Sequence, residues 1–143
     1  MSQSLLRKSI VSICSLVLAG AASAATLTIE ITEISEPKGK LMVKLVASGA
    51  AYAGEQKPTA VQAVDVTSKA PISLKFADLA PGTYAVMVMQ DENGNGQLDS
   101  NMVGIPKEGY GFSNNPRVMR KPTFDESKFV VTEADQQIKI EIR

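Results

Sequence analysis

The segment that begins at Asp91 carries oxygen-bearing side chains at alternate positions, which is the pattern that a loop needs to surround a hard cation such as Ca²⁺. Asp91, Asn93 and Asn95 stand at relative positions one, three and five, and Asp99 stands at position nine. Gln97 offers a backbone carbonyl at position seven. The spacing therefore predicts a calcium site of weak to moderate affinity, with a Kd of roughly 10⁻⁴–10⁻³ M as in extracellular modules.

The pattern departs from the helical calcium hand at position twelve, where Met102 replaces the bidentate glutamate. Glu92 or Glu108 is then the candidate for an additional carboxylate ligand. A tight turn without metal is the alternative interpretation. Gly94 and Gly96 each follow an asparagine and accept a positive φ, and an aspartate can close such a turn by accepting backbone N–H groups. The sequence leaves both interpretations open.

A glycine-rich aromatic segment follows only a few residues later. Tyr110 and Phe112 alternate with glycines, and Asn114 and Asn115 come next. These four residues are the candidate surface for contact with a peptide or a glycan, with one ring expected to pack inward and the other to be exposed. The alternative is that both aromatic rings only attach a long loop to the body of the domain.

The composition excludes several kinds of catalysis. The chain has no histidine, so it has no serine–histidine or cysteine–histidine pair and no histidine zinc ligand. A hydrolase that uses Glu108 with Asp99 or Asp125 remains a third hypothesis, because two carboxylates can act as acid and base. The methionines include Met87 and Met89 on one strand face, and we expect them to fill the core rather than to bind copper.

The first residues have the features of a secretory signal. Arg7 and Lys8 precede an apolar run that is too short to span a bilayer, and cleavage is predicted after Ala24. Removal of residues 1–24 also removes the only cysteine, Cys14, and leaves 13 basic and 15 acidic residues. We therefore expect a periplasmic or secreted domain over 25–143, with no membrane span after cleavage and no nucleic-acid partner.

The remainder of the chain has the period-two pattern of half-buried strands. Turn-forming residues such as Pro and Gly separate the runs, whereas 91–125 is long, rich in Gly, Asn and Pro, and without strand periodicity. The fold class predicted is all-β, an antiparallel β-sandwich of about seven strands, immunoglobulin-like or prealbumin-like, with one long loop. The predicted strands centre on 27–31, 41–45, 60–66, 72–76, 84–89, 128–131 and 138–142.

Three segments also carry a resemblance to a known family. They are Leu79-x-Pro81-Gly82-x-Tyr84-Ala85-Val86, Asp91-Glu92-Asn93-Gly94-Asn95-Gly96-x-Leu98-Asp99 and Gly104-Ile105-Pro106-x-Glu108-Gly109-Tyr110-Gly111-Phe112-Ser113-Asn114. Together they resemble domain-of-unknown-function family 2141, which consists of small exported bacterial proteins. The first segment is also similar to the strand entry of carboxypeptidase-regulatory-like and prealbumin-like sandwiches. The resemblance implies an exported all-β domain and no particular activity.

Taken together, these features lead to the hypothesis of a non-catalytic binding module of the bacterial envelope, whose partner is an envelope protein, a peptide or a glycan. Calcium in the acidic loop would order the aromatic segment that follows. A structural or carrier domain without metal is the first alternative, and the carboxylate-dependent hydrolase is the second. The sequence does not determine the oligomeric state.

Overall fold

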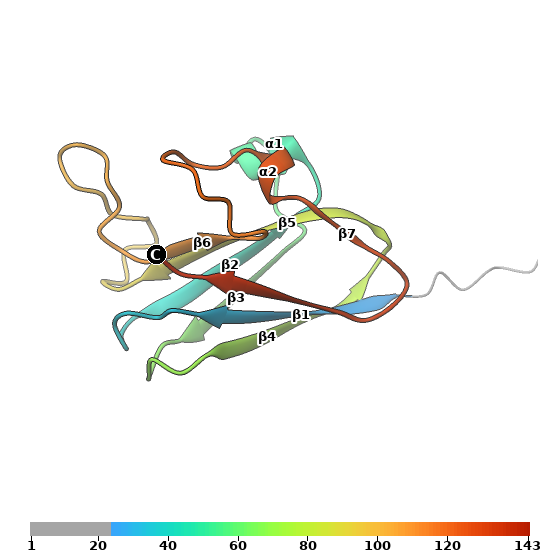
Figure 1. The fold of residues 1–143 in the computed structure, drawn as a ribbon, viewed down its shortest axis with the longest axis horizontal. Coiled ribbons are helices and arrows are strands. Elements are labelled where there is room, and N and C mark those ends of the chain that lie inside the picture. The colour runs from blue at the N-terminus through green and yellow to red at the C-terminus, as the bar shows by residue number, and fades with distance from the viewer. Residues whose placement is uncertain (1–23) are drawn as a thin grey trace, which may run out of the picture.

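The computed structural model describes residues 24–143, which contain eight strands and two short helices (Figure 1). The predicted signal segment, with its positive residues, its apolar run and Cys14, lies outside the described residues. The elements in chain order are β1 (Ala25–Thr32), β2 (Lys40–Val46), α1 (Gly49–Ala53), β3 (Ala60–Asp65), β4 (Ile72–Leu79), β5 (Gly82–Asp91), β6 (Tyr110–Phe112), α2 (Phe124–Ser127), β7 (Phe129–Val131) and β8 (Gln136–Glu141).

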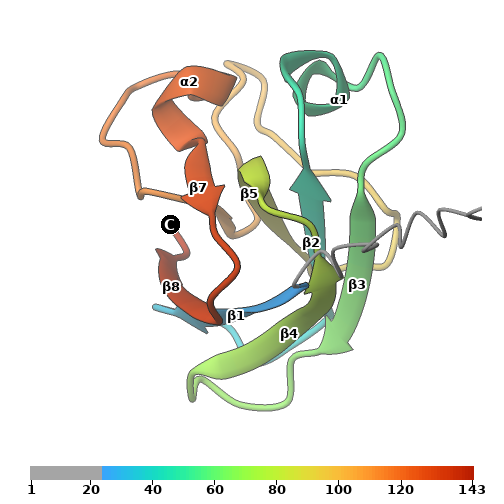
Figure 2. The ribbon, with the colours of Figure 1, turned by 90° about the vertical axis from the view of Figure 1, so that its right-hand side faces the viewer.

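The strands form two sheets that pack face to face. One sheet has the order β4-β1-β8, and the other has the order β3-β2-β5-β6, with β7 paired to the first residues of β5. Figure 2 shows α1 and α2 on the side of the five-stranded sheet that faces away from the three-stranded sheet. The predicted all-β sandwich is confirmed, and it contains one parallel pair, between β1 and β8.

The core lies between the sheets and follows the alternation in the sequence. Alternate residues of β1 and β2 point inward and are fully buried, as are Val86 on β5 and Ile140 on β8. Because one face of each strand is buried, the register of the pairing is fixed by the apolar pattern. The buried residues of this cluster include Leu27, Ile29, Ile31, Leu41, Val43 and Leu45.

The segment predicted as one long loop, 91–125, contains regular structure that the pattern did not indicate. Strand β6 pairs with β5 over Met87 to Met89, and α2 begins at Phe124. The inner face of β6 lies so close to β8 that a Cβ on Gly111 would be 2.7 Å from Ile140 Cγ2 and 2.9 Å from the Glu141 carbonyl oxygen. A glycine-containing strand of three residues shows no period-two signal, and for that reason the prediction was wrong for this strand.

Candidate functional site

The acidic loop that follows β5 is organised by the carboxylate of Asp91. This side chain is only 6% exposed, and it accepts hydrogen bonds from the backbone N–H groups of Gly94, Asn95 and Gly96 at 2.8, 3.1 and 2.8 Å. Gly94 and Gly96 have φ values of 78° and 74°, which confirms their predicted positive φ. The carboxylate therefore fixes the bend at Gly94 to Gly96 by accepting their backbone N–H groups.

The remaining predicted ligands lie together at the open side of the loop. The side-chain nitrogens of Asn93 and Asn95 both donate to the carboxylate of Asp99. Their side-chain oxygens accept the backbone N–H groups of Asn95 and Gln97, at 3.0 and 2.9 Å. A calcium ion among these groups would need amide oxygens, not nitrogens, turned toward Asp99.

The additional carboxylates have structural contacts. Glu108 is 7% exposed, and its two oxygens accept the backbone N–H groups of Glu92 and Asp99 at 3.0 and 2.9 Å. The Glu92 carboxylate pairs with Lys38 at 2.8 Å, and this hydrogen bond raises the pKa of Lys38. Within residues 24–143, no group of three or more histidine, cysteine, aspartate or glutamate side chains is arranged to hold a metal ion.

A second feature, which the sequence did not predict, is the outer face of the five-stranded sheet. Residues Leu41, Val43, Val86 and Val88 point into the core, so the residues between them point outward. The register aligns these outward residues in two rows across β2, β5 and β6. The rows are Met42–Met89–Tyr110 and Lys44–Met87–Phe112.

This arrangement corrects the prediction of core filling for Met89 only, because Met87 packs against a second buried cluster made of Val46, Ala51, Tyr52 and Ala85. Both side chains lie on the outer face and are partly exposed, because β5 carries Val86 and Val88 on its inner face. Flexible thioether side chains adapt to ligands of varied shape, so methionine on an outer face is a sign of a binding surface. The signal was present in the sequence, since Met42 likewise alternates with two core residues.

The loops beside this face convert it into a groove, which we call the outer groove. The long loop adds Leu98, Ile105 and Pro106 to its wall, and Tyr52 of α1 stands at another side. The groove has a volume of about 900 Å³, within the range of small-molecule sites. Its floor consists of Met42, Met87, Met89, Tyr110 and Phe112.

The charged side chains that line the outer groove are all cationic: Lys44, Arg120, Lys121 and Arg143. Lys44 is exposed and has no ion-pair partner among residues 24–143. Lys121 lies with its Nζ atom 4.8 Å from the centre of the Tyr52 ring. An apolar floor below a cationic rim favours a ligand that has an apolar body and a negative head.

The predicted aromatic and asparagine surface divides into two parts. Tyr110 and Phe112 both face outward, with their ring centres 6.1 Å apart, so neither ring packs between the sheets. Asn114 and Asn115 are instead in left-handed turns, with φ of 65° and 47°. Their side chains bond backbone groups of α2 and β8, which holds the turn in place. The aromatic rings belong to the outer groove and the asparagines support its edge.

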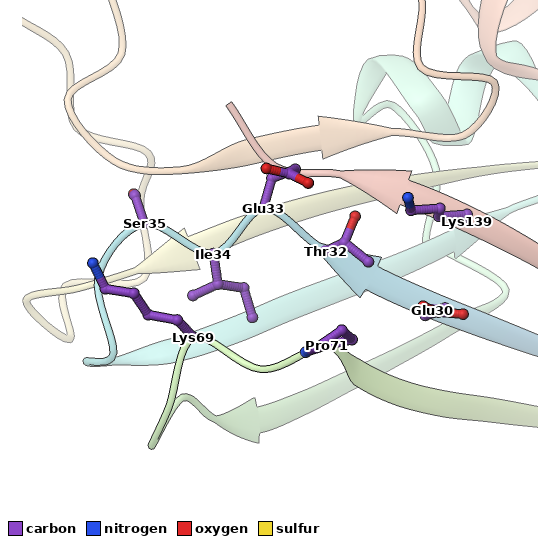
Figure 3. A pocket seen from close by; sticks show the side chains of 8 residues that line it. All are labelled: Glu30, Thr32, Glu33, Ile34, Ser35, Lys69, Pro71 and Lys139. Carbon is purple, nitrogen blue, oxygen red and sulfur yellow. The ribbon is translucent and has the colours of Figure 1, made fainter.

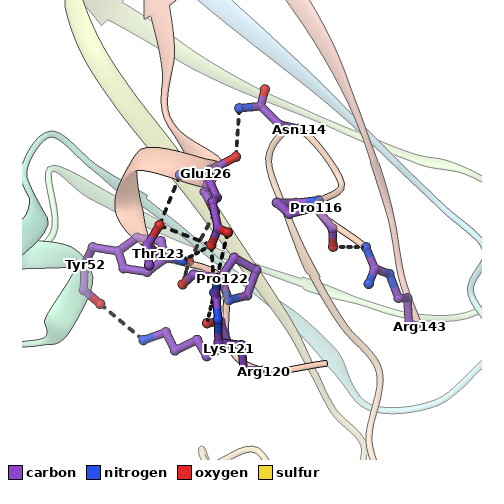
Figure 4. A network of polar contacts seen from close by, with 10 residues as sticks. Tyr52, Asn114, Pro116, Arg120, Lys121, Pro122, Thr123, Glu126 and Arg143 are labelled. Atoms are coloured by element: carbon purple, nitrogen blue, oxygen red, sulfur yellow. Dashed lines mark hydrogen bonds and ion pairs between the residues drawn. The ribbon is translucent and has the colours of Figure 1, made fainter. Parts of the chain in front are cut away.

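Residues 116–123, which we call the strap, carry two of the cations and are fixed by polar contacts (Figure 4). Arg120 forms a two-pronged ion pair with Glu126 at 2.7 and 2.8 Å, and Lys121 donates to the Tyr52 carbonyl oxygen. Glu126 also closes a capping box with Thr123 at the start of α2. These contacts, above all the bond from Arg120, lower the pKa of Glu126 to about 2.

This lowered pKa predicts a dependence of stability on acid. A carboxyl group with a lower pKa in the folded state stabilises the fold above its unfolded pKa of about 4.3, and the effect disappears as the pH falls toward 2. We expect Glu126→Gln to have a lower melting temperature than the parent at pH 7 and an equal one near pH 2. Thermal melts at pH 7, 4, 3 and 2 measure this, and a constant difference at every pH would contradict it.

A smaller pocket lies at the end of the three-stranded sheet (Figure 3). It is lined by two carboxylates and two lysines, Glu30, Glu33, Lys69 and Lys139, and it has a volume of about 580 Å³. Glu30 already accepts a hydrogen bond from Gln137 at 3.1 Å. With both signs of charge around it, this pocket favours no class of ligand, and we assign it no function.

Of the predicted residues of the hydrolase alternative, Asp99 and Glu108 are in contact through the Asp99 backbone N–H, whereas Asp125 belongs to another element. Glu108 is buried with both oxygens bonded to backbone N–H groups, whereas Asp125 lies on α2 and pairs with Lys128.

In residues 24–143 the longest helix has five residues, and none is long and apolar enough to cross a membrane.

Comparison with known proteins gives one match. A family model described as "uncharacterized protein conserved in bacteria (DUF2141)" matches residues 29–139, which cover β2 to β7, parts of β1 and β8, and the whole of the outer groove floor. No curated protein and no solved structure matches the chain.

Proposed function

Because the chain belongs to domain-of-unknown-function family 2141, which is described as uncharacterized, we propose its function from the geometry of the outer groove. The protein is an exported, non-catalytic module that binds an amphipathic anion in this groove. The observation that carries the proposal is the composition of the groove lining. Its floor is methionine and aromatic, and all of its charged residues are lysine or arginine. The predicted signal segment is the reason for placing the module in the periplasm or outside the cell.

The ligand class follows from the two parts of the groove. An alkyl chain or an apolar ring system covers the floor, where removal of apolar surface from water favours binding by about 25 cal/mol per Å². A carboxylate at the end of the ligand lies near Lys44, because among residues 24–143 Arg120 is paired with Glu126, whereas Lys121 and Arg143 donate to backbone carbonyl oxygens. Long-chain carboxylates combine both features.

Titration calorimetry with three dodecyl compounds, each below its micelle concentration, tests this proposal. The compounds are dodecanoate, dodecyltrimethylammonium and dodecyl maltoside, which share one chain and differ in charge. We expect dodecanoate to bind about tenfold more tightly than the cation, and we expect Lys44→Glu to remove most of this preference. Equal affinities for the three compounds, or no binding of any, would contradict the proposal.

Two variants separate the parts of the groove. Met89→Asp places a carboxylate on the floor and is expected to weaken binding of all three compounds, because a charge there meets the apolar chain. Lys75→Glu is the matched control for Lys44→Glu. It reverses an exposed charge on β4, in the other sheet, so it should leave every affinity unchanged.

A calcium-dependent loop is a second component of the proposal. Its support is that the five predicted ligands lie in one short loop, with Asn93 and Asn95 both in contact with Asp99. Calcium would then stabilise the wall of the outer groove that contains Leu98. The alternative is a structural or carrier domain with a metal-free loop, and the two differ in whether stability depends on calcium concentration.

A further inference from the structure

The hairpin formed by residues 99–107 exposes large apolar side chains at its tip. Met102, Val103 and Ile105 are 105, 78 and 59% exposed. Met119 on the neighbouring strap is 106% exposed. These four are more than half of the large apolar side chains exposed in the described chain, so their concentration at one place calls for an explanation.

The tip is held in this exposed conformation by its own hydrogen bonds. The side-chain oxygen of Asn101 accepts the backbone N–H groups of Val103 and Ile105, both at 3.0 Å. At the base, Lys107 N donates to Asp99 O at 2.8 Å, and Ser100 pairs with Pro106. The buried Glu108 carboxylate ties this base to Glu92. The apolar side chains are therefore presented outward by an ordered hairpin.

The hairpin stands beside the cationic rim. Ile105 and Pro106 line the same groove as Arg120 and Lys121 of the strap. In Figure 1 the hairpin, the light-orange loop at the upper left, and the strap rise on the same side of the five-stranded sheet. Exposed apolar residues next to lysine and arginine complement a surface that is apolar inside and negative outside.

We propose that the tip of the 99–107 hairpin inserts between the headgroups of an anionic phospholipid bilayer, while Lys121, the strap cation without an ion-pair partner among residues 24–143, contacts the lipid phosphates. A bilayer is favoured over a protein partner because the tip is convex and has only a few aliphatic side chains. A stable protein interface buries about 1,200–2,000 Å² in total and needs a complementary surface. This inference goes beyond the groove ligand and does not depend on it.

The absence of tryptophan from the chain makes a direct test possible. Val103→Trp places one fluorophore at the tip, and Val130→Trp, on β7, is a matched control at a side chain that is 62% exposed. Both are made in a chain that starts at Ala25, which contains every described strand and helix. Each variant is mixed with vesicles of phosphatidylglycerol and phosphatidylethanolamine, with and without brominated acyl chains, and with vesicles of phosphatidylcholine alone.

We expect the emission of Val103→Trp to shift to the blue and to be quenched by brominated lipid only when phosphatidylglycerol is present, while Val130→Trp does not change. In sedimentation with the same vesicles, Val103→Asp should weaken the binding of the chain about tenfold, because an aliphatic contact is lost. Equal quenching at both positions, quenching without anionic lipid, or no quenching at the tip would overturn the proposal. The last outcome would favour a protein partner for the tip.

Discussion

Gly39→Ala is expected to destabilise the protein by at least about 4 kcal/mol. A large fraction of the variant protein would then be unfolded even without denaturant. A Cβ at this position would lie 2.1 Å from the Asp91 carbonyl oxygen and 2.6 Å from Glu92 Cα, and both are backbone atoms that side-chain rotation cannot move. Gly39 also has a φ of 71°, which L side chains rarely adopt. The effect reaches the acidic loop, because Asp91 and Glu92 form its first residues. Urea denaturation followed by circular dichroism measures the loss.

Two other glycines separate the clash from the backbone strain. Gly94 has a similar φ of 78° with open space around it, so Gly94→Ala should cost only about 1–2 kcal/mol. Gly49 lies in α1 with no neighbour within 4 Å, and its replacement by alanine should be neutral or slightly stabilising. Unfolding of Gly39→Ala and Gly94→Ala at the same urea concentration would contradict the close contact between Gly39 and the backbone of Asp91 and Glu92.

Asp91→Ala is expected to cost about 3 kcal/mol, because three backbone N–H groups lose a charged acceptor. This is less than three full charged hydrogen bonds, since Gly94, Asn95 and Gly96 are exposed and water can replace the carboxylate as acceptor. Asp99→Ala is the matched control. Its carboxylate accepts from the side chains of two exposed asparagines, so its removal should cost less than about 1 kcal/mol. Urea denaturation of both variants and the parent gives the two differences.

The same pair of variants decides between the two interpretations of the loop. If calcium binds, the parent melts at a higher temperature in millimolar Ca²⁺ than in chelator, and both variants lose this increase. If the loop is a metal-free turn, the melting temperature of the parent is independent of calcium, and each variant is destabilised by the same amount in both conditions. An increase in the melting temperature of Asp91→Ala equal to that of the parent would place any calcium site elsewhere.

Much of the fold follows from period-two patterns. The inward residues of β1, β2 and β8 were evident because apolar side chains alternate with polar ones, and burial of one face then fixes the register. The parallel pairing of β1 with β8 was not predictable, because periodicity says which face of a strand is buried and nothing about its neighbour. Strand β6 escaped prediction because Gly111 is needed for close contact with Ile140, a contact known only in three dimensions.

The candidate site likewise has one part that the sequence predicted and another that it did not. The position of the acidic loop and the bends at Gly94 and Gly96 were predicted from local chemistry, which operates within a few residues. The outer groove was not predicted, since Met87 and Met89 were expected to fill the core rather than to form part of a surface. Their exposure depends on how the hairpin and the strap pass beside the sheet, and the path of the strap is set by long-range contacts such as those of Pro122 and Lys121 with Tyr52.

The position of β1 in the middle of its sheet has a consequence for the order of events when the protein is made. β1 pairs with β4 on one edge and with β8 on the other, and β8 follows it by more than one hundred residues along the chain. The three-stranded sheet is therefore incomplete until β8 has left the ribosome, and its closure is slow because the paired segments are distant. Until then the edge of β1 that later pairs with β8 keeps its backbone N–H and C=O groups unpaired, and an unpaired strand edge can pair with another chain.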